Sequence, residues 1–424
     1  MKKTLLTASL LLLSAALSFG QKALVDQAWS LAKKSEKPDF KTARNTIQQA
    51  LAGESAEDVK AWYVAGNIEQ RFYEKENEQA QFGMAAKEKE MDLALEEGYK
   101  YYRKAVGLDT LPNAKGKVKP KYVKNIQKDL IANSDGYINA GVRYFNEQNY
   151  KKAYDMWNIF IEIRDLPFMA SVKKDMPADS IYAMLEYNAA LAALNSGDDE
   201  LTLQALLRAK GNGYEQNNVY KFIVGQYEAA RDTANLVAIL NEGNDLFSNL
   251  DVVATRPDGT TITQKENYYS LRLINLYIAS NDYDKAIDIL NAVVAIDPEN
   301  PELWNVKGQL LEAQDNIAGA IECFEKALNM NPNFALALGN MGRMYFNQAV
   351  EKNNELSEKI SNTSEFNAAK EAEVLPLYRQ ALPYYEKAHQ IDANEREYMV
   401  ALRSIYYNLN DGKNLKLIEM EMGF

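Results

Sequence analysis

Residues 304–332 read WNVKGQLLEAQDNIAGAIECFEKALNMNP, and this stretch decides the fold. Its key positions are Trp304, Gly308, Leu311, Ala320, Phe324, Ala327 and Pro332. Moving on by 34 residues gives Leu338, Gly342 and Tyr345, and moving back by 34 gives Tyr277, Ala286, Leu290 and Pro298. One offset reproduces small, aromatic and proline positions together, which predicts a tandem repeat of helical pairs.

Elementary packing explains why these residue types recur. Two antiparallel helices can cross closely only where small residues such as Gly308 and Ala327 lie at the crossing. Large side chains such as Trp304 and Phe324 then fill the space beside it. Proline lacks the N–H that a helix interior needs, so Pro332 ends one helix before the next begins.

The period and the pattern resemble the tetratricopeptide repeat (TPR), with Lys307 and Leu311 departing from its usual Leu and Tyr. The same frame recurs earlier in Ala43, Ile47, Ala50, Trp62, Gly66, Tyr137, Gly141, Tyr144, Ala153 and Trp157. Weaker units lie near 180–214 and 216–250. The resemblance implies an all-α TPR helix-turn-helix solenoid of about eight or nine helical pairs.

Two units are interrupted at the same point of the repeat, between their first and second helices. After Gly66 the matching second helix arrives only at Tyr102, and after Gly342 it arrives only at Tyr385. The inserted residues, near 73–92 and 347–373, are rich in Ala, Glu, Lys and Gln, which are strong helix formers. We interpret both as helical extensions; the alternative is a solvated loop.

Helical character breaks most clearly at 255–263, where Pro257-Asp258-Gly259 favours a turn and the threonines after it favour extended backbone. We therefore predict an N-terminal TPR-like array at 21–250, a linker at 251–264 and a C-terminal TPR array at 265–424.

The first 20 residues are typical of a secretory signal peptide. Lys2 and Lys3 precede a short uncharged run, and small residues precede Gln21. That run is too short to span a bilayer, and no later stretch is apolar enough to do so. Gln21 is not a cysteine, so we expect an exported, periplasmic protein that is not a lipoprotein and has no transmembrane segment.

The charge excludes one class of partner. Removal of residues 1–20 changes the formal net charge from -11 to -13, because Lys2 and Lys3 are lost with it. Nucleic acids are bound by neutralising phosphates with Lys and Arg, so we expect no nucleic-acid partner. The acidity serves solubility; a preference for basic partners is the alternative reading.

Catalytic signatures are missing from the sequence. It has one histidine, His389, and one cysteine, Cys323, which are too few for a histidine metal site, and we expect the two not to meet as a nucleophile pair. We expect no metal, no cofactor and no enzymatic activity. An enzyme would need two facing carboxylates with perturbed pKa values in a groove.

Binding surfaces are the more promising feature. In the first helix of each clear unit, residues spaced by four and then three share one face. In TPR proteins this face lines the concave groove, and the resemblance therefore implies that it contacts partners; the alternative is packing against the neighbouring unit. The candidates are Tyr63, Asn67, Gln70, Phe145, Asn275, Asn305, Gln309, Glu312, Arg343 and Phe346.

These features favour an exported TPR scaffold that mediates protein–protein interactions, in a bacterial envelope complex. Its partner would be a protein or peptide, or a second copy of the chain. Groove positions carry few cations apart from Arg343, which argues against a clamp for a chaperone's C-terminal carboxylates. The alternative is a glycan-binding protein on a TPR scaffold, using tyrosines such as Tyr99, Tyr101 and Tyr102.

Overall fold

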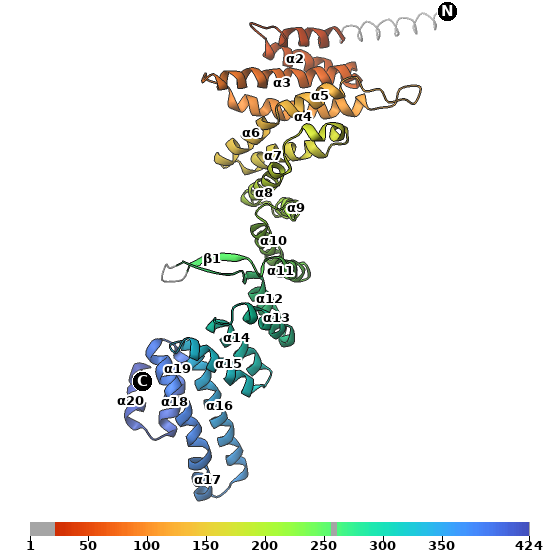
Figure 1. Ribbon diagram of the computed structural model, residues 1–424. Helices are drawn as coiled ribbons and strands as arrows, with labels where there is room; N and C mark the ends of the chain where they lie inside the picture. The colour runs from red at the N-terminus through yellow and green to blue at the C-terminus, as the bar shows by residue number, and fades with distance from the viewer. Residues whose placement is uncertain (1–21, 256–260, 424) are drawn as a thin grey trace, which may run out of the picture. The chain divides into compact units, whose positions relative to one another are not determined.

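The computed structural model describes residues 22–255 and 261–423, most of which are helical (Figure 1). The predicted signal peptide at 1–20 and the turn at 256–260 lie outside the described residues. None of the helices described combines the length and the apolarity that a membrane span requires. The chain divides into two compact units, the first ending at Ala230 and the second beginning at Arg231.

The first unit contains helical residues 22–32 followed by α2 (Phe40–Leu51), α3 (Val59–Gln81), α4 (Glu88–Asp109), α5 (Val123–Ala132), α6 (Ser134–Asn146), α7 (Tyr150–Asp165), α8 (Asp179–Ser196), α9 (Asp199–Ala209) and α10 (Gln216–Ala230). Short 3-10 helices lie at Glu54–Glu57 and Pro167–Asp175.

The second unit contains α11 (Thr233–Phe247), β1 (Asp251–Thr255), β2 (Thr261–Lys265), α12 (Tyr268–Ala279), α13 (Tyr283–Ile296), α14 (Pro301–Ala313), α15 (Ile317–Met330), α16 (Ala335–Lys359), α17 (Thr363–Ala369), a π-helix (Lys370–Val374), α18 (Leu375–Ile391), α19 (Arg396–Asn408) and α20 (Gly412–Glu421). Within each unit, helices adjacent in sequence pack in antiparallel pairs, which confirms the predicted solenoid of TPR type.

The structure contains the close contact between helices that the repeat predicts, in which a glycine of one helix faces an aromatic ring of the other. A Cβ added to Gly308 would overlap the ring of Phe324, and one added to Gly141 would overlap the indole of Trp157. Both rings are buried, at 0% and 3% exposure. Each glycine therefore admits a large side chain from the second helix of its own pair.

The two interrupted units keep the same contact across their insertions. The ring of Tyr102 in α4 lies against Gly66 in α3, and the ring of Tyr385 in α18 lies against Gly342 in α16. Residues 73–92 comprise the end of α3, a short connection and the start of α4. Residues 347–373 comprise the end of α16, α17 and most of the π-helix, and Figure 1 shows α17 at the far end of this long hairpin.

Left-handed residues turn the chain between the two helices of a pair. Asn281 and Asp315, one 34-residue repeat apart, have φ angles of 58° and 59°. The Asp315 N–H then donates to the Glu312 carbonyl at 2.9 Å, and the Asn316 N–H donates to the Leu311 carbonyl at 2.8 Å. Asn and Asp tolerate this backbone better than other non-glycine residues, so the turn repeats with the sequence.

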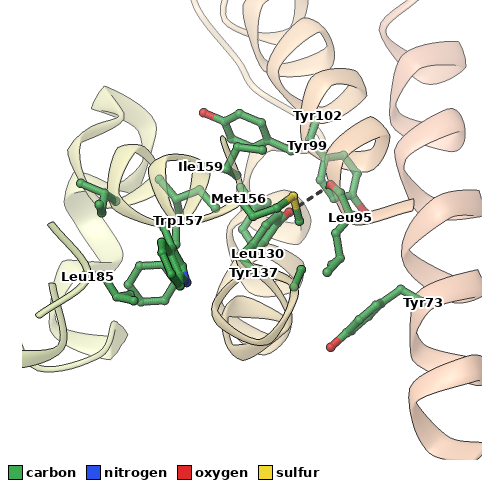
Figure 2. Close-up of a cluster of buried hydrophobic side chains, with 14 of the residues drawn as sticks. Tyr73, Leu95, Tyr99, Tyr102, Leu130, Tyr137, Met156, Trp157, Ile159 and Leu185 are labelled. Atoms are coloured by element: carbon green, nitrogen blue, oxygen red, sulfur yellow. Dashed lines mark hydrogen bonds between the residues drawn. The ribbon is translucent and has the colours of Figure 1, made fainter. Parts of the chain in front are cut away.

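Aromatic side chains dominate the core of the first unit. Figure 2 shows Tyr73, Tyr99, Tyr102, Tyr137 and Trp157 among aliphatic neighbours from successive helices. The Tyr137 hydroxyl is buried and donates to the carbonyl of Leu95 at 3.3 Å. Burial raises the pKa of Tyr137 far above its ordinary value, so this hydroxyl stays protonated.

The second unit contains a β-hairpin within the segment predicted as a linker. β1 and β2 pair antiparallel with Asp251 opposite Lys265, and their charged groups lie 2.7 Å apart. Val252 and Val253 in β1 are β-branched residues that favour strands. The division between the compact units falls earlier than this linker, after Ala230. The hairpin is thus an element of the second unit.

We expect Gly141→Ala to destabilise the first unit by about 1–3 kcal/mol, because the new methyl group must displace the Trp157 ring. Gly225→Ala is the matched control: Gly225 lies within α10, and a Cβ there meets nothing within 4 Å. It should stabilise the helix by up to about 1 kcal/mol. Urea unfolding followed by circular dichroism measures both, and equal effects would contradict the packing argument.

Candidate functional site

The candidate site lies on the first helices of the pairs in the second unit. Helices α14 and α16 contact each other, although α15 separates them in sequence. We call the residues they present together with α12 the first-helix face. It consists of Asn275, Asn305, Gln309, Glu312, Asn340 and Arg343.

A hydrogen-bond network joins α14 to α16 on this face. The Asn340 Nδ2 group donates to Asn305 Oδ1 at 2.8 Å, and both side chains are buried. Arg343 Nη2 donates to Glu312 Oε2 at 2.8 Å and to Asn340 Oδ1 at 2.9 Å. The network therefore fixes three of the predicted residues, Asn305, Glu312 and Arg343, in one arrangement.

Burial and charge act in opposite directions on Glu312. Burial raises the pKa of its carboxyl group above the ordinary value, the Arg343 guanidinium lowers it, and the carboxylate of Glu397 raises it further. The net direction is upward, although the ion pair with Arg343 is formed. The ion pair with Arg343 therefore offsets part of the cost of burying this carboxylate.

Two predicted residues on this face are available for contact. Asn275 and Gln309 are exposed, and within the described part of the chain neither side chain makes a hydrogen bond. Each amide offers two donors and one acceptor, which matches the alternating groups of a peptide backbone. They lie on α12 and α14, one 34-residue repeat apart, and α14 also carries Asn305 and Glu312 of the network.

The candidates in the first unit form a separate group. Tyr63 stacks on Tyr122 with ring centroids 4.3 Å apart. Asn67 accepts a hydrogen bond from the Tyr102 hydroxyl at 3.2 Å. Gln70 is buried, and its Nε2 atom has no partner among the described residues. These side chains mainly hold α3 against its neighbours.

The two predicted phenylalanines pack against other rings. Phe145 lies against Tyr150 and Trp157, with centroids 5.2 and 5.8 Å away. Phe346 meets the ring of Tyr378 edge-on at 5.6 Å. Both are half-buried, so packing against neighbouring helices occupies much of their surface.

Sequence reasoning missed Asn340, which is central to the network. The frame of four and then three residues selects positions 339, 343 and 346 in this helix and passes over 340. A signal was present, because Asn340 follows Asn305 by 35 residues and sits within an apolar stretch. A polar residue in such a stretch indicates a buried hydrogen bond.

The described residues contain few groups of side chains that could bind a metal or act as a nucleophile. No group of three or more His, Cys, Asp or Glu residues there could hold a metal ion. Cys323 is buried, which raises the pKa of its thiol. His389 Nε2 lies 2.9 Å from Glu421 Oε2, on α18 and α20. The tyrosines weighed for glycan binding are largely occupied, since Tyr99 and Tyr102 are buried and Tyr101 accepts a hydrogen bond from Gln48.

Comparison with known proteins identifies the repeat directly. Residues 273–338, which include α13, α14 and α15, match the family model described as tetratricopeptide repeat. This segment of the chain is therefore built of tetratricopeptide repeats.

The chain matches only part of the length of its relatives. The chain is similar to the DnaJ homolog subfamily C member 7 homolog of Schizosaccharomyces pombe, at 27% identity over 237 residues, 54% of this chain and 45% of the relative. It is similar to the peroxisomal targeting signal receptor of Candida albicans, at 34% identity over 67 residues, 16% of this chain and 11% of the relative. The chain thus spans less than half of each.

One solved structure to which the chain is similar is that of YrrB, which is described as a TPR protein with an unusual peptide-binding site. The match has 15% sequence identity and a TM-score of 0.31, and covers 51% of this chain and 96% of that one.

We expect Arg343→Met to destabilise the second unit by about 1 kcal/mol at neutral pH, because Glu312 would keep a buried charge without its cation. A carboxyl group with a raised folded-state pKa favours folding when protonated, and that contribution is lost as the pH rises through the raised value. The cost of the substitution should therefore shrink on acidification.

Urea unfolding at about pH 7 and at about pH 4, the second of which lies below the raised carboxyl pKa, measures this change. The control is the same substitution in a Glu312→Gln background, where the cost should no longer depend on pH. A cost in the wild-type background that is equal at both pH values would show that Arg343 does not act through Glu312.

Proposed function

We propose that this protein is an exported scaffold that binds an extended segment of a partner protein along its first-helix face. The observation that carries the proposal is the combination of two exposed amides, Asn275 on α12 and Gln309 on α14, with the hydrogen-bonded network that joins α14 to α16. Amide side chains bind a peptide backbone without demanding one sequence. The packed helices hold these groups in fixed positions, which reduces the ordering cost of binding.

The charged pair on the same face adds selectivity. Arg343 and Glu312 retain partial exposure, with side-chain accessibilities of 33% and 19%. A peptide that approaches them must match their charges or leave them unpaired on desolvation. One relative is by its name a receptor for a targeting signal, which supports peptide binding as the general role.

The cell envelope is the proposed location. It rests on the sequence of residues 1–20, in which two lysines, an uncharged apolar run and small residues precede Gln21. The partner we propose is accordingly an envelope protein, and the reaction chemistry of an enzyme has no part in this role.

A photoreactive residue in place of Gln309 should crosslink to the partner in cells that make the protein. The matched control is the same residue at Glu325, which is exposed on α15, the second helix of the same pair. Removing both exposed amides in Asn275→Ala/Gln309→Ala, with a different crosslinking position on α14, should lower the yield about tenfold, which corresponds to about 1.4 kcal/mol. Equal adducts from positions 309 and 325 would refute binding on the first-helix face.

Export predicts a defined N-terminus. Protein isolated from the periplasm of a Gram-negative host should have the mass of a chain that begins at Gln21, because the signal peptide is removed on translocation. Leu11→Arg, which places a charge in the apolar run, should leave the protein in the cytoplasm with its first 20 residues attached. Intact-mass measurement of both fractions decides this, and a periplasmic Leu11→Arg protein would contradict it.

A further inference from the structure

The acidic charge of the chain is distributed unevenly between its two units. Residues 22–230 contain 29 Lys and Arg residues against 30 Asp and Glu residues. Residues 231–424 contain 17 against 29. Nearly the whole negative charge that follows the predicted signal peptide therefore belongs to the second unit.

Part of that charge surrounds a groove of about 770 Å³ beside the β-hairpin. Its apolar floor comes from α12, α13 and α14, and the hairpin forms one wall. We call it the acidic groove; its lining includes Asp251, Leu271, Asp297, Glu299, Glu302 and Val306.

The carboxylates of the acidic groove are only partly neutralised. Lys265 pairs with Asp251 at 2.7 Å. Asp297 accepts a hydrogen bond from the Asn300 amide at 3.0 Å, which adds no positive charge. Within the described residues, Glu299 and Glu302 form no ion pair and are exposed. The groove thus combines apolar surface with unpaired negative charge and suits a basic segment that also carries apolar side chains.

The first unit contains a segment of that chemistry. Residues 111–121, between α4 and α5, read LPNAKGKVKPK and are all exposed. This lysine loop carries four lysines and no acid, and its Leu111 and Val118 are 61% and 50% exposed. Figure 1 shows the loop extending beyond the ends of the neighbouring helices. Within the described residues, Lys115, Lys117 and Lys119 form no ion pair.

The lysine loop is ordered at both its base and its tip. At the base, Asp109 accepts hydrogen bonds from the backbone N–H groups of Lys121 and Tyr122, at 2.9 and 2.6 Å. At the tip, the Asn113 side chain accepts from the N–H groups of Lys115 and Lys117, at 2.9 and 3.2 Å. Such a preformed projection loses little conformational entropy when it docks.

We propose that the lysine loop of one copy of this protein docks in the acidic groove of a second copy. Lysines meet the carboxylates of Glu299 and Glu302, and Leu111 and Val118 contact the apolar floor. The two surfaces of this contact differ, so each copy keeps a free loop and a free groove. A contact of this kind builds chains of copies rather than a closed pair, unless its rotation closes a ring.

Sedimentation velocity of the purified protein tests this proposal. At about 0.01 M salt, where charges act over about 30 Å, the average mass should rise with protein concentration. At about 1 M salt, where they act over about 3 Å, the mass should return to that of one chain. A single-chain mass at all concentrations in low salt would overturn the proposal.

Charge reversal identifies the two surfaces. Lys115→Glu/Lys117→Glu/Lys119→Glu and Glu299→Lys/Glu302→Lys should each remain single chains at low salt, because loop and groove then repel. Mixing the two variants should restore association, since each reversed loop meets a groove of opposite charge in the other variant. A mixture that stays dissociated would refute the pairing.

The matched control is Lys33→Glu/Lys34→Glu/Lys37→Glu, which changes the net charge by the same amount at exposed residues elsewhere in the first unit. It should associate like the wild type; loss of association there would assign the effect to net charge and overturn the proposal. Circular dichroism checks that each variant is folded. The loop variant keeps this test separate from the Gln309 crosslink, because Lys115, Lys117 and Lys119 lie between α4 and α5, whereas Glu302 lies on α14, two helical turns from Gln309.

Discussion

The structure depends on one repeated contact, in which an aromatic ring of a second helix lies against a glycine of the first helix. Phe324 on Gly308 and Tyr385 on Gly342 are two instances in the second unit. The contact sets how closely the two helices of a pair approach, and that distance sets where the next pair can stack. The faces that the stacked helices present follow from this spacing.

Because the contact is local to one pair, the chain tolerates insertions beyond it. Each pair needs only its own crossing and its neighbours, as in other repeat proteins. The extra turns of α3, α4, α16 and α18 lengthen two hairpins while Gly66 and Gly342 keep their ring partners. Insertions therefore add surface without disturbing the stack, and the lysine loop between α4 and α5 is a further addition of this type.

The sequence predicts the packing positions that recur from repeat to repeat. It does not predict features that occur only once, such as the hairpin or the hydrogen bond of Asn340. The 34-residue offset identified Gly308, Phe324 and their counterparts, because each copy of the unit repeats the same packing problem. Among the described residues, the hairpin at β1 and β2 has no counterpart in the other repeats, and its pairing depends on contacts between two strands. Asn340 was not predicted as a site residue, because helical periodicity locates a helix face only to within one position, whereas a hydrogen bond selects a single residue.

The polar network on the first-helix face is a costly way to join two helices. Buried polar groups must be desolvated, and apolar side chains of similar size would hold α14 and α16 together at least as well. Arg343 even leaves its Nε atom buried without a hydrogen-bond partner among the described residues. Packing alone does not account for Asn305, Asn340 and Arg343 at adjacent places. A requirement to hold the partly exposed Arg343 and Glu312 in fixed positions near Gln309 does account for them, which is why we propose a binding role for this face.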